Sequence, residues 1–597
     1  MFHQDRLMDI YYKLKDHYNA QLAQIIKKYN AISFFRLVAA VLFFIALFYL
    51  IKTGATFLGF LGALFLIAFI VLMRFHTKIS NQKKLKQALV SINQDEIDYL
   101  RTEKIPFENG LEFNDFQHPY AYDLDIFGEH SLFQNLNRTF TFSGKKTLAN
   151  QLVKLLSNEE IIANQKAVQE LTQKLDWRQD FMASAKISND TKTAYDTLMR
   201  WRKSASAPIS KAMIVLSFVS PVIFLMVLVA YWITSIPVLV SMLTFHFMFH
   251  LALMGKFYKR ITSEINEAEN IDKIITQYGL LVRKIEEESF VSDKLKNLQQ
   301  GLVVGNQKAS THLNYLSVLF SRMDSIGNFV STLLFNGTFL FHIHTLKALI
   351  EWKKQHSGNL EKWLDVIGEF EMLNSLANFS YNNPKFVFPG LNTHNEITFS
   401  NLSHPLLNEK NRVGNDVSFV QHPFVILTGS NMSGKSTFLR SLGINMVLTG
   451  IGSAVCASKA NVHPLPVLVS MRLSDSLSDS ESYFYAEIKR LKQIMDELEN
   501  NRAFVLLDEI LRGTNSDDKR SGTIEVVKKM IARKAIGAIA THDIEVCLTT
   551  NDYPGQLANK CFEVEIINND LHFDYKLREG ICKNKSATFL MEKMGVI

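Results

Sequence analysis

Residues 429–436 carry the side chains best suited to bind a phosphate group. They read GSNMSGKS and fit the pattern G-x-x-x-x-G-K-[ST] of the phosphate-binding P-loop. An apolar run of strand length, residues 424–427, precedes them, and a helical pattern starts at Thr437. Glycines let backbone N–H groups approach phosphate oxygens closely, and the N-terminus of the following helix adds partial positive charge. The stretch therefore predicts a nucleotide site.

Within this site we expect ATP and Mg²⁺ as ligands. Lys435 would reach the β- and γ-phosphates, and the Ser436 hydroxyl would bind Mg²⁺. The candidate nucleotide-binding residues are Gly429, Ser430, Asn431, Met432, Ser433, Gly434, Lys435, Ser436 and Thr437.

Two further apolar runs end in residues that would complete this chemistry. Residues 504–507 read FVLL and lead into Asp508 and Glu509. We expect Asp508 to hold Mg²⁺, directly or through water, and Glu509 to act as general base on the water that attacks the γ-phosphate. Residues 535–540 lead to His542, which we expect to contact the γ-phosphate; an ordinary surface histidine is the alternative.

These motifs resemble those of the MutS family of DNA mismatch repair ATPases. Residues 428–437 read TGSNMSGKST where that family typically has TGPNMGGKST, and residues 508–514 read DEILRGT, similar to its DEIGRGT. Residues 540–542 match its A-T-H, and residues 482–487, SYFYAE, resemble its S-T-F-x-x-E. In the family, the serine of that last segment reaches the γ-phosphate held by the partner subunit. The resemblance thus implies a homodimer in which Ser482 contacts the nucleotide.

The resemblance continues more weakly towards the N-terminus. Residues 404–405 (HP) and 415–417 (NDV) resemble the start of the family's ATPase domain, and residues 132–144 and 371–377 resemble the two ends of its helical core. It implies an ATP-driven switch of the helical core and duplex DNA as a partner. We find no segment that fits the F-x-E wedge of the family's mismatch-reading domain, so we do not expect that domain here.

Two pairs of apolar segments set this chain apart from ordinary MutS proteins. Residues 37–51 and 57–73 form the first pair, and residues 213–233 and 238–254 form the second. A membrane-spanning helix needs about 20 apolar residues, with a lower limit of roughly 17. Because residues 213–254 contain no Lys, Arg, Asp or Glu, we expect each pair to cross a bilayer as a helical hairpin. Buried core helices in a soluble protein are the alternative.

Basic residues indicate the orientation of both hairpins. Lys27, Lys28 and Arg36 precede the first hairpin and Lys52 alone lies at its tip, whereas the tip of the second has no basic residue. The positive-inside rule then predicts a multi-pass protein of the inner (cytoplasmic) membrane, with the ATPase and both termini in the cytoplasm. Another apolar run, residues 329–346, contains polar residues, and we expect it to be a core helix.

The predicted fold is an α/β P-loop ATPase domain of the ABC type plus a long all-α core or lever domain, with two transmembrane helical hairpins. The length of 597 residues allows several domains. The four cysteines form no C-x-x-C pair, which gives no reason to expect a zinc site or a disulfide. The expected divisions are 1–30, N-terminal helix; 31–75, first hairpin; 76–120, linker; 121–211 and 256–385, helical core; 212–255, second hairpin; and 386–597, ATPase domain.

The function we expect is that of a DNA-binding ATPase of the mismatch-repair family, tethered to the membrane. The alternative is a membrane-embedded MutS-like ATPase that acts on a protein or a lipid-linked partner without recognising mismatches. A hairpin inserted in the helical core favours this alternative. A transporter is a weaker possibility, because the hairpins hold no acidic residue, although His246 and His250 lie one turn apart.

Overall fold

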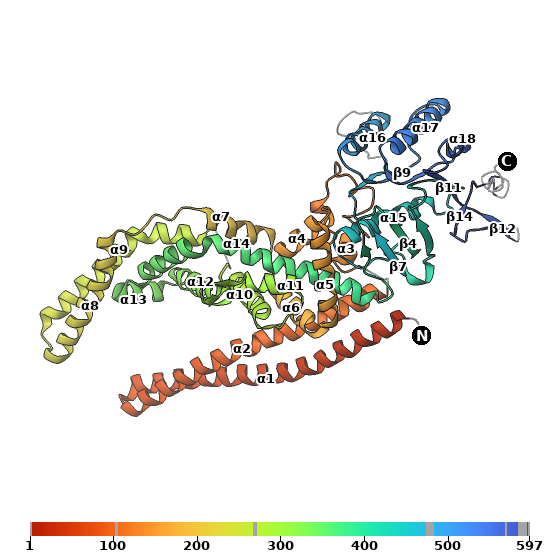
Figure 1. The fold of residues 1–597 in the computed structure, drawn as a ribbon. Coiled ribbons are helices and arrows are strands. Elements are labelled where there is room, and N and C mark those ends of the chain that lie inside the picture. The colour runs from red at the N-terminus through yellow and green to blue at the C-terminus, as the bar shows by residue number, and fades with distance from the viewer. Residues whose placement is uncertain are drawn as a thin grey trace.

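The protein is mostly helical, with mixed β-sheets gathered at one end of an elongated molecule (Figure 1). The computed structural model describes residues 3–101, 105–266, 271–472, 483–567 and 570–582, together with Met591 and Met594. Its helices form a long body. The C-terminal third of the chain forms the α/β part, which lies at one end of this body.

A six-stranded sheet forms the centre of the α/β part. Its strand order is β14-β11-β6-β10-β9-β8, and all neighbours pair in parallel except β14, which is antiparallel to β11. The central strands β6, β10 and β9 are buried at every position and read as continuous apolar runs, as expected where both faces of a parallel sheet are covered. The bounds are β6 (Phe424–Gly429), β8 (Val467–Ser470), β9 (Phe504–Asp508), β10 (Ile536–Ala540), β11 (Leu557–Phe562) and β14 (Leu577–Glu579).

Helices and a second sheet surround these strands (Figure 1). The second sheet has the order β3-β7-β4-β5, and a short antiparallel pair joins β12 to β13. The remaining elements of this part are α15 (Lys435–Gly450), α16 (Tyr483–Asn500), α17 (Ser516–Ala532), α18 (Ile544–Leu548), β3 (Gly390–Leu391), β4 (Ile397–Leu402), β5 (Asn415–Ser418), β7 (Lys459–Val462), β12 (Glu565–Ile567) and β13 (Asp570–His572).

The helical body is built around α14 (Phe341–Asn382), which runs along its length to the α/β part. Apolar side chains recur along the surrounding helices at helical spacing, as Ile271, Ile275, Tyr278 and Val282 do on α10, so each helix buries one face. The surrounding elements are α3 (Leu132–Leu136), α4 (Phe142–Leu152), α5 (Asn158–Gln173), α6 (Leu175–Ile187), α7 (Lys192–Lys203), α10 (Ile271–Glu287), α11 (Asp293–Gln300), α12 (Ala309–Asp324), β1 (Val303–Val304) and β2 (Gln307–Lys308).

Two helical hairpins extend from this body. The first is α1 (His3–Thr53) and α2 (Thr56–Leu100), and the second is α8 (Lys211–Thr234) and α9 (Pro237–Asn266). The turns of the two hairpins lie away from the strands (Figure 1). Among the residues described, four helices are long and apolar enough to cross a membrane, and they are these four.

The first hairpin is longer than its apolar segments. Residues 76–100, which we expected to belong to a linker, continue α2 without a break. Ala88, Leu89 and Ile92 recur at helical spacing and pack with Met182 and Ala183 of α6. Over residues 76–100 the structure therefore shows a helix that an apolar stripe holds against the body.

Residues 329–346 do not form the single core helix that we expected. They divide at Leu340, which has a left-handed backbone (φ 52°), into α13 (Phe329–Phe339) and the start of α14, and the two helices are bent by 86°. The Asn336 side chain accepts a hydrogen bond from the backbone N–H of His342 at 3.0 Å, which replaces a helical bond at the bend. Five of the eleven residues of α13 stay exposed; Phe329, for example, is 76% exposed.

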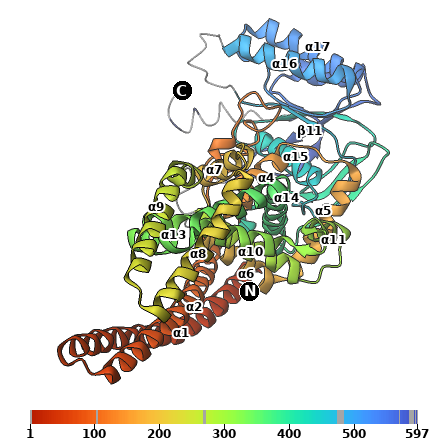
Figure 2. The same cartoon turned by 90° about the vertical axis from the view of Figure 1, so that its left-hand side faces the viewer.

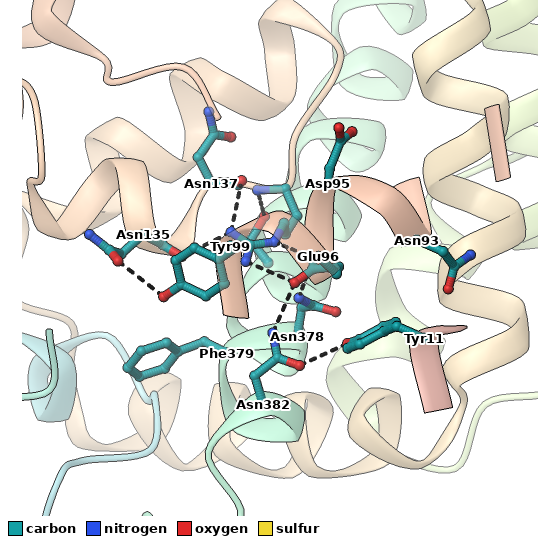
Figure 3. A network of polar contacts seen from close by, with 12 residues as sticks. Tyr11, Asn93, Asp95, Glu96, Tyr99, Asn135, Asn137, Asn378, Phe379 and Asn382 are labelled. Atoms are coloured by element: carbon teal, nitrogen blue, oxygen red, sulfur yellow. Dashed lines mark hydrogen bonds and ion pairs between the residues drawn. The ribbon is translucent and has the colours of Figure 1, made fainter. Parts of the chain in front are cut away.

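A buried polar network joins the first hairpin to α14 (Figure 3). Glu96 of α2 pairs with Arg138 at 2.5 and 3.1 Å, and it also accepts hydrogen bonds from the side-chain amides of Asn378 and Asn382. The Tyr11 hydroxyl of α1 donates to Asn382 at 2.7 Å. Both helices of the hairpin are therefore fastened to the end of α14 that adjoins the α/β part.

Candidate nucleotide-binding site

The glycine-rich loop lies between β6 and α15, the strand–loop–helix setting that its motif requires. Lys435 begins α15, and its ammonium group donates hydrogen bonds to the carbonyl oxygens of Gly429 and Ser430 at 2.8 and 3.0 Å. Burial lowers the pKa of Lys435, while the nearby carboxylates of Glu509 and Asp508 oppose that shift. Gly434 has a left-handed backbone (φ 103°), and a Cβ there would lie 3.0 Å from the Tyr575 ring, so the position favours glycine.

The ends of three parallel strands bring the acidic residues to this loop. The register pairs Ala540 of β10 with Leu427 of β6 and with Asp508 of β9. The N–H of Glu509 donates to the Ala540 carbonyl at 3.0 Å. Because the carboxyl ends of β6, β9 and β10 share one edge of the sheet, Lys435, Glu509 and His542 gather there although they are far apart in the chain.

Glu509 and His542 form a hydrogen-bonded pair. His542 Nε2 lies 2.8 Å from Glu509 Oε1. This hydrogen bond lowers the pKa of Glu509 to about 2, against the opposite effect of burial, and the His542 and Arg512 charges lower it further. Glu509 is consequently a carboxylate at neutral pH, and the structure places His542 against it.

The polar atoms that lack a partner at this site suit a nucleotide with bound Mg²⁺ as ligand. In the described part of the chain, Asp508 Oδ1 and the hydroxyls of Ser430 and Ser433 are buried without a hydrogen-bond partner. Such groups are costly to leave unpaired, and carboxylate and hydroxyl oxygens are the ligands that Mg²⁺ prefers. Ser436 and Asp508 would hold the ion, as the sequence predicts.

A cavity of about 780 Å³ opens over the loop. Its volume is in the range of sites for cofactors and small molecules. Besides the loop and Glu509, it is lined by residues for which the sequence motifs assigned no contact, among them His404, Asn415, Phe573 and Tyr575. The Asn415 side chain donates to the Tyr575 carbonyl at 3.0 Å and accepts from the N–H of Leu577 at 2.8 Å, so β5 holds this wall in place.

Comparisons with known proteins agree with the motifs. The family model of MutS domain V matches residues 425–595, which include the loop, Asp508, Glu509 and His542. The DNA mismatch repair protein MutS of Thermotoga maritima is 26% identical over 324 residues, which cover 53% of this chain and 36% of that protein. MutS of Finegoldia magna is 29% identical over 236 residues (38% and 27%), and the human MutS protein homolog 4 is 28% identical over 247 residues (39% and 25%).

Residues 425–595 belong to domain V of the MutS family. This match confirms the resemblance to the MutS family that the motifs indicated. The chain spans about a third or less of the length of these curated relatives, between 25% and 36%.

The segment that resembles a MutS signature contributes one residue, Glu487, to which the motifs assigned no role. Glu487 of α16 accepts hydrogen bonds from the N–H groups of Leu511 and Arg512 at 2.7 and 3.2 Å. Arg512 in turn donates to the Glu509 carbonyl at 3.0 Å. Glu487 therefore holds the turn that follows Asp508 and Glu509. The sequence feature that could have identified Glu487 is its position at the end of the SYFYAE segment.

The Ser482 of the same MutS segment lies outside the described residues, which resume at Tyr483. Its assignment to the nucleotide of a partner subunit stays a prediction.

His404, in the HP pair that resembles the start of the MutS ATPase domain, lines the cavity as an uncharged ring. Burial lowers the pKa of His404 to about 4, and the charges of Arg440 and Arg412 act in the same direction. His404 therefore adds no positive charge to the wall of the cavity.

Proposed function

We propose that this MutS family member is a membrane-tethered ATPase that binds duplex DNA as a homodimer. The observation that carries the ATPase is the meeting of Lys435, Asp508, Glu509 and His542 at one edge of the six-stranded sheet, under a cavity of about 780 Å³. The reaction is ATP + H₂O to ADP + phosphate.

Each residue of the site would have a separate role in ATP hydrolysis. Lys435 exchanges its two loop carbonyls for the β- and γ-phosphates, and Ser436 and Asp508 hold Mg²⁺. Mg²⁺, when bound, neutralises the charge that develops on the phosphate oxygens. Glu509 orients the attacking water and accepts its proton.

His542 would couple nucleotide binding to this step. A carboxylate whose pKa is about 2 is a weak proton acceptor, and the cause is the hydrogen bond from His542. On contact with a γ-phosphate, His542 would leave Glu509, and burial would then raise the basicity of the carboxylate. The Ser482 hydroxyl of the second subunit would complete the site, and the difference between ATP and ADP contacts would bias the helical body between two arrangements.

Exposed apolar side chains support the membrane tether. Phe44 and Phe60 on the first hairpin are 65% and 77% exposed, and Trp232 on the second is 86% exposed. Large apolar surfaces of this kind on a soluble protein would mark a binding site or an aggregation hazard. We assign residues 31–75 and 212–255 to the bilayer of the inner (cytoplasmic) membrane, residues 386–597 to the ATPase, and the ATPase and both termini to the cytoplasm.

A second candidate function is action on a protein or a lipid-linked partner without mismatch recognition. It is favoured by the position of α8 and α9, which leave the helical body between α7 and α10 and extend from the end opposite the strands (Figure 1). By the resemblance, this is where MutS proteins extend the arms that clamp DNA.

ATP hydrolysis by the detergent-purified chain tests these proposals. It is measured without DNA and with homoduplex, mismatched or branched DNA. Lys435→Ala is the blank, and Lys459→Ala, which changes an exposed lysine of β7, is the matched control. DNA-stimulated hydrolysis that needs Lys435 supports the DNA-binding ATPase. Hydrolysis that needs Lys435 but ignores every DNA, with no ATP-dependent DNA binding, favours the second candidate, and no hydrolysis at all refutes both.

A further inference from the structure

The helix α13 presents an apolar surface that no other element in the described part of the chain covers. Phe329, Val330, Leu334, Phe335 and Phe339 are between 45% and 76% exposed. Residues 325–346 contain no Lys, Arg, Asp or Glu. A short exposed helix without any charge is unusual at a water-facing surface, where the solvated face of a helix is normally polar.

The opposite face of α13 packs against the second hairpin. Asn336 and Gly337 are buried, and a Cβ at Gly337 would lie 2.2 Å from the Phe247 ring of α9. This close approach seats α13 beside α9 where the hairpin leaves the helical body (Figures 1 and 2).

Two histidines satisfy backbone carbonyls that would otherwise need water. Pro221 has no N–H, so the Ser217 carbonyl four residues earlier in α8 lacks its helical partner, and His344 Nε2 donates to it at 2.9 Å. The Gly337 carbonyl lies in the last turn of α13, and His250 Nδ1 donates to it at 2.9 Å. His250 Nε2 in turn accepts from the Ser220 hydroxyl at 2.7 Å.

This arrangement suits a dry environment. In hydrocarbon, a helix break is tolerated only where neighbouring side chains bond the freed backbone groups. At the kink in α8 and at the end of α13, histidine side chains from other helices do so.

We infer that α13 lies in the cytoplasmic leaflet of the bilayer, with its exposed face covered by lipid. The inference rests on the proposed crossing of the membrane by α8 and α9. His250 lies four residues from Met254, the last residue of the apolar segment, which is about 6 Å along a helix at 1.5 Å per residue. Helices that lie in the membrane interface bury their apolar face to a depth of about 5–10 Å.

Continuity and charge identify lipid as the occupant. α13 packs beside α8 and α9, which carry exposed apolar side chains of their own, such as Val215 and Met248, each 60% exposed. Charged residues flank the uncharged stretch: Arg322 and Asp324 precede it, and the Lys347 ammonium lies over the Phe218 ring of α8, 5.6 Å from its centre. Lysine and arginine at such positions reach the headgroups while their stems lie along apolar surface.

Fluorescence quenching by lipid tests the inference on the full chain. The chain carries Cys582→Ser, because the other three cysteines are buried. A polarity-sensitive fluorophore is attached at Val330→Cys or Leu334→Cys, and the protein is reconstituted into vesicles of phosphatidylcholine and phosphatidylglycerol. The quencher is a lipid with a nitroxide near the headgroup end of its acyl chain. Val229→Cys on α8 reports on the hairpin, and Gln355→Cys on an exposed site of α14 is the aqueous control.

We expect quenching at positions 330 and 334 several-fold stronger than at position 355. Quenching at position 229 without quenching at 330 and 334 overturns the inference and leaves the membrane hairpin standing. Absence of quenching at position 229 as well refutes the hairpin itself. A disulfide between two copies through Val330→Cys, with no quenching by lipid, would show that a second copy covers α13, and it also overturns the inference.

Discussion

Individual residues decide whether the candidate site can hydrolyse ATP. Glu509 combines a left-handed backbone (φ 48°) with a hydrogen bond from His542 and a turn held by Glu487. Non-glycine residues adopt that conformation at an energetic cost and are often found at functional sites. The conformation aims Glu509 into the cavity that the loop lines.

The substitution Glu509→Gln should separate binding from hydrolysis. The amide keeps the size of the side chain but cannot accept the proton of the water. We expect hydrolysis to fall by about 10²–10⁴-fold while ATP still binds. The measurements are steady-state hydrolysis and equilibrium binding of a fluorescent ATP analogue.

The matched control is Glu545→Gln, an exposed carboxylate on α18 that pairs with Arg520. It should leave both quantities unchanged. Equal hydrolysis by Glu509→Gln and the wild-type chain would remove Glu509 from the mechanism.

The raised pKa of Glu371 predicts that the stability of the fold depends on pH. Burial raises the pKa of Glu371 from its ordinary value of 4.5 to about 7, although hydrogen bonds from Thr141 and Phe140 lower it. Between these values the folded state holds the proton that the unfolded state has lost, so stability falls as the pH rises from 4.5 to 7, by about 3 kcal/mol. Glu371→Gln should remove this part of the slope in thermal unfolding followed from pH 4.5 to 8.

Thr141→Val provides a control that should extend the pH-dependent loss of stability rather than remove it. It removes a hydrogen bond that lowers the pKa of Glu371, so the loss of stability should extend to higher pH than in the wild-type chain. Identical slopes in all three proteins would show that Glu371 is not the titrating group.

At the scale of elements, the packing of α13 on α9 depends on satisfied backbone groups. His250 is fully buried, and it bonds both Gly337 and Ser220. His246, one turn earlier on the same helix, bonds within the described chain only the Met242 carbonyl of its own helix, at 3.1 Å. The two histidines are thus a matched pair in which one joins helices and the other does not.

The substitution His250→Ala should lower stability in detergent, because it leaves the Gly337 carbonyl without a partner. A buried carbonyl left unpaired costs about 1–3 kcal/mol. Thermal unfolding measures the loss, and His246→Ala is the control with little expected effect. Equal midpoints for both variants would mean that the bonds of His250 do not hold α13.

At the scale of the whole molecule, α14 connects the hairpins to the ATPase part. One end of α14 adjoins α13 and the second hairpin, and the other carries Asn378 and Asn382, which bond Glu96 of the first hairpin (Figure 3). A movement of α14 driven by nucleotide would therefore act on both hairpins.

The substitution Glu96→Ala should loosen the first hairpin. It leaves Arg138 buried without its carboxylate, and removal of one partner of a buried ion pair costs about 3–5 kcal/mol. We expect easier unfolding in urea and faster proteolysis of α1 and α2. Asp95→Ala, next to it, is the control, because Asp95 pairs with Lys186 near the surface, where an ion pair contributes about 0–1 kcal/mol. Equal effects of the two substitutions would contradict the anchoring role of Glu96.

The sequence by itself determined the family, the mostly helical composition with mixed sheets, and the positions of the loop, of Asp508 and of the four apolar segments. These features are local: a P-loop is a contiguous run between a strand and a helix, and an apolar segment is recognised by its length and lack of charge. The roles assigned to Lys435, Glu509 and His542 stay predictions, although the structure brings these residues together.

Only the tertiary structure decided which distant segments contact one another. Asn415 meets Tyr575, Glu487 meets Leu511, and Glu96 meets Arg138 through contacts between segments that no local pattern relates. The break at Leu340 is of the same kind, because apolar composition alone cannot distinguish one long helix from two. His250 of the second hairpin bonds the Gly337 carbonyl of α13, and His344 of α14 bonds the Ser217 carbonyl of the hairpin. Hydrogen bonds and packing depend on positions in space, and for these residues only the folded chain sets the positions.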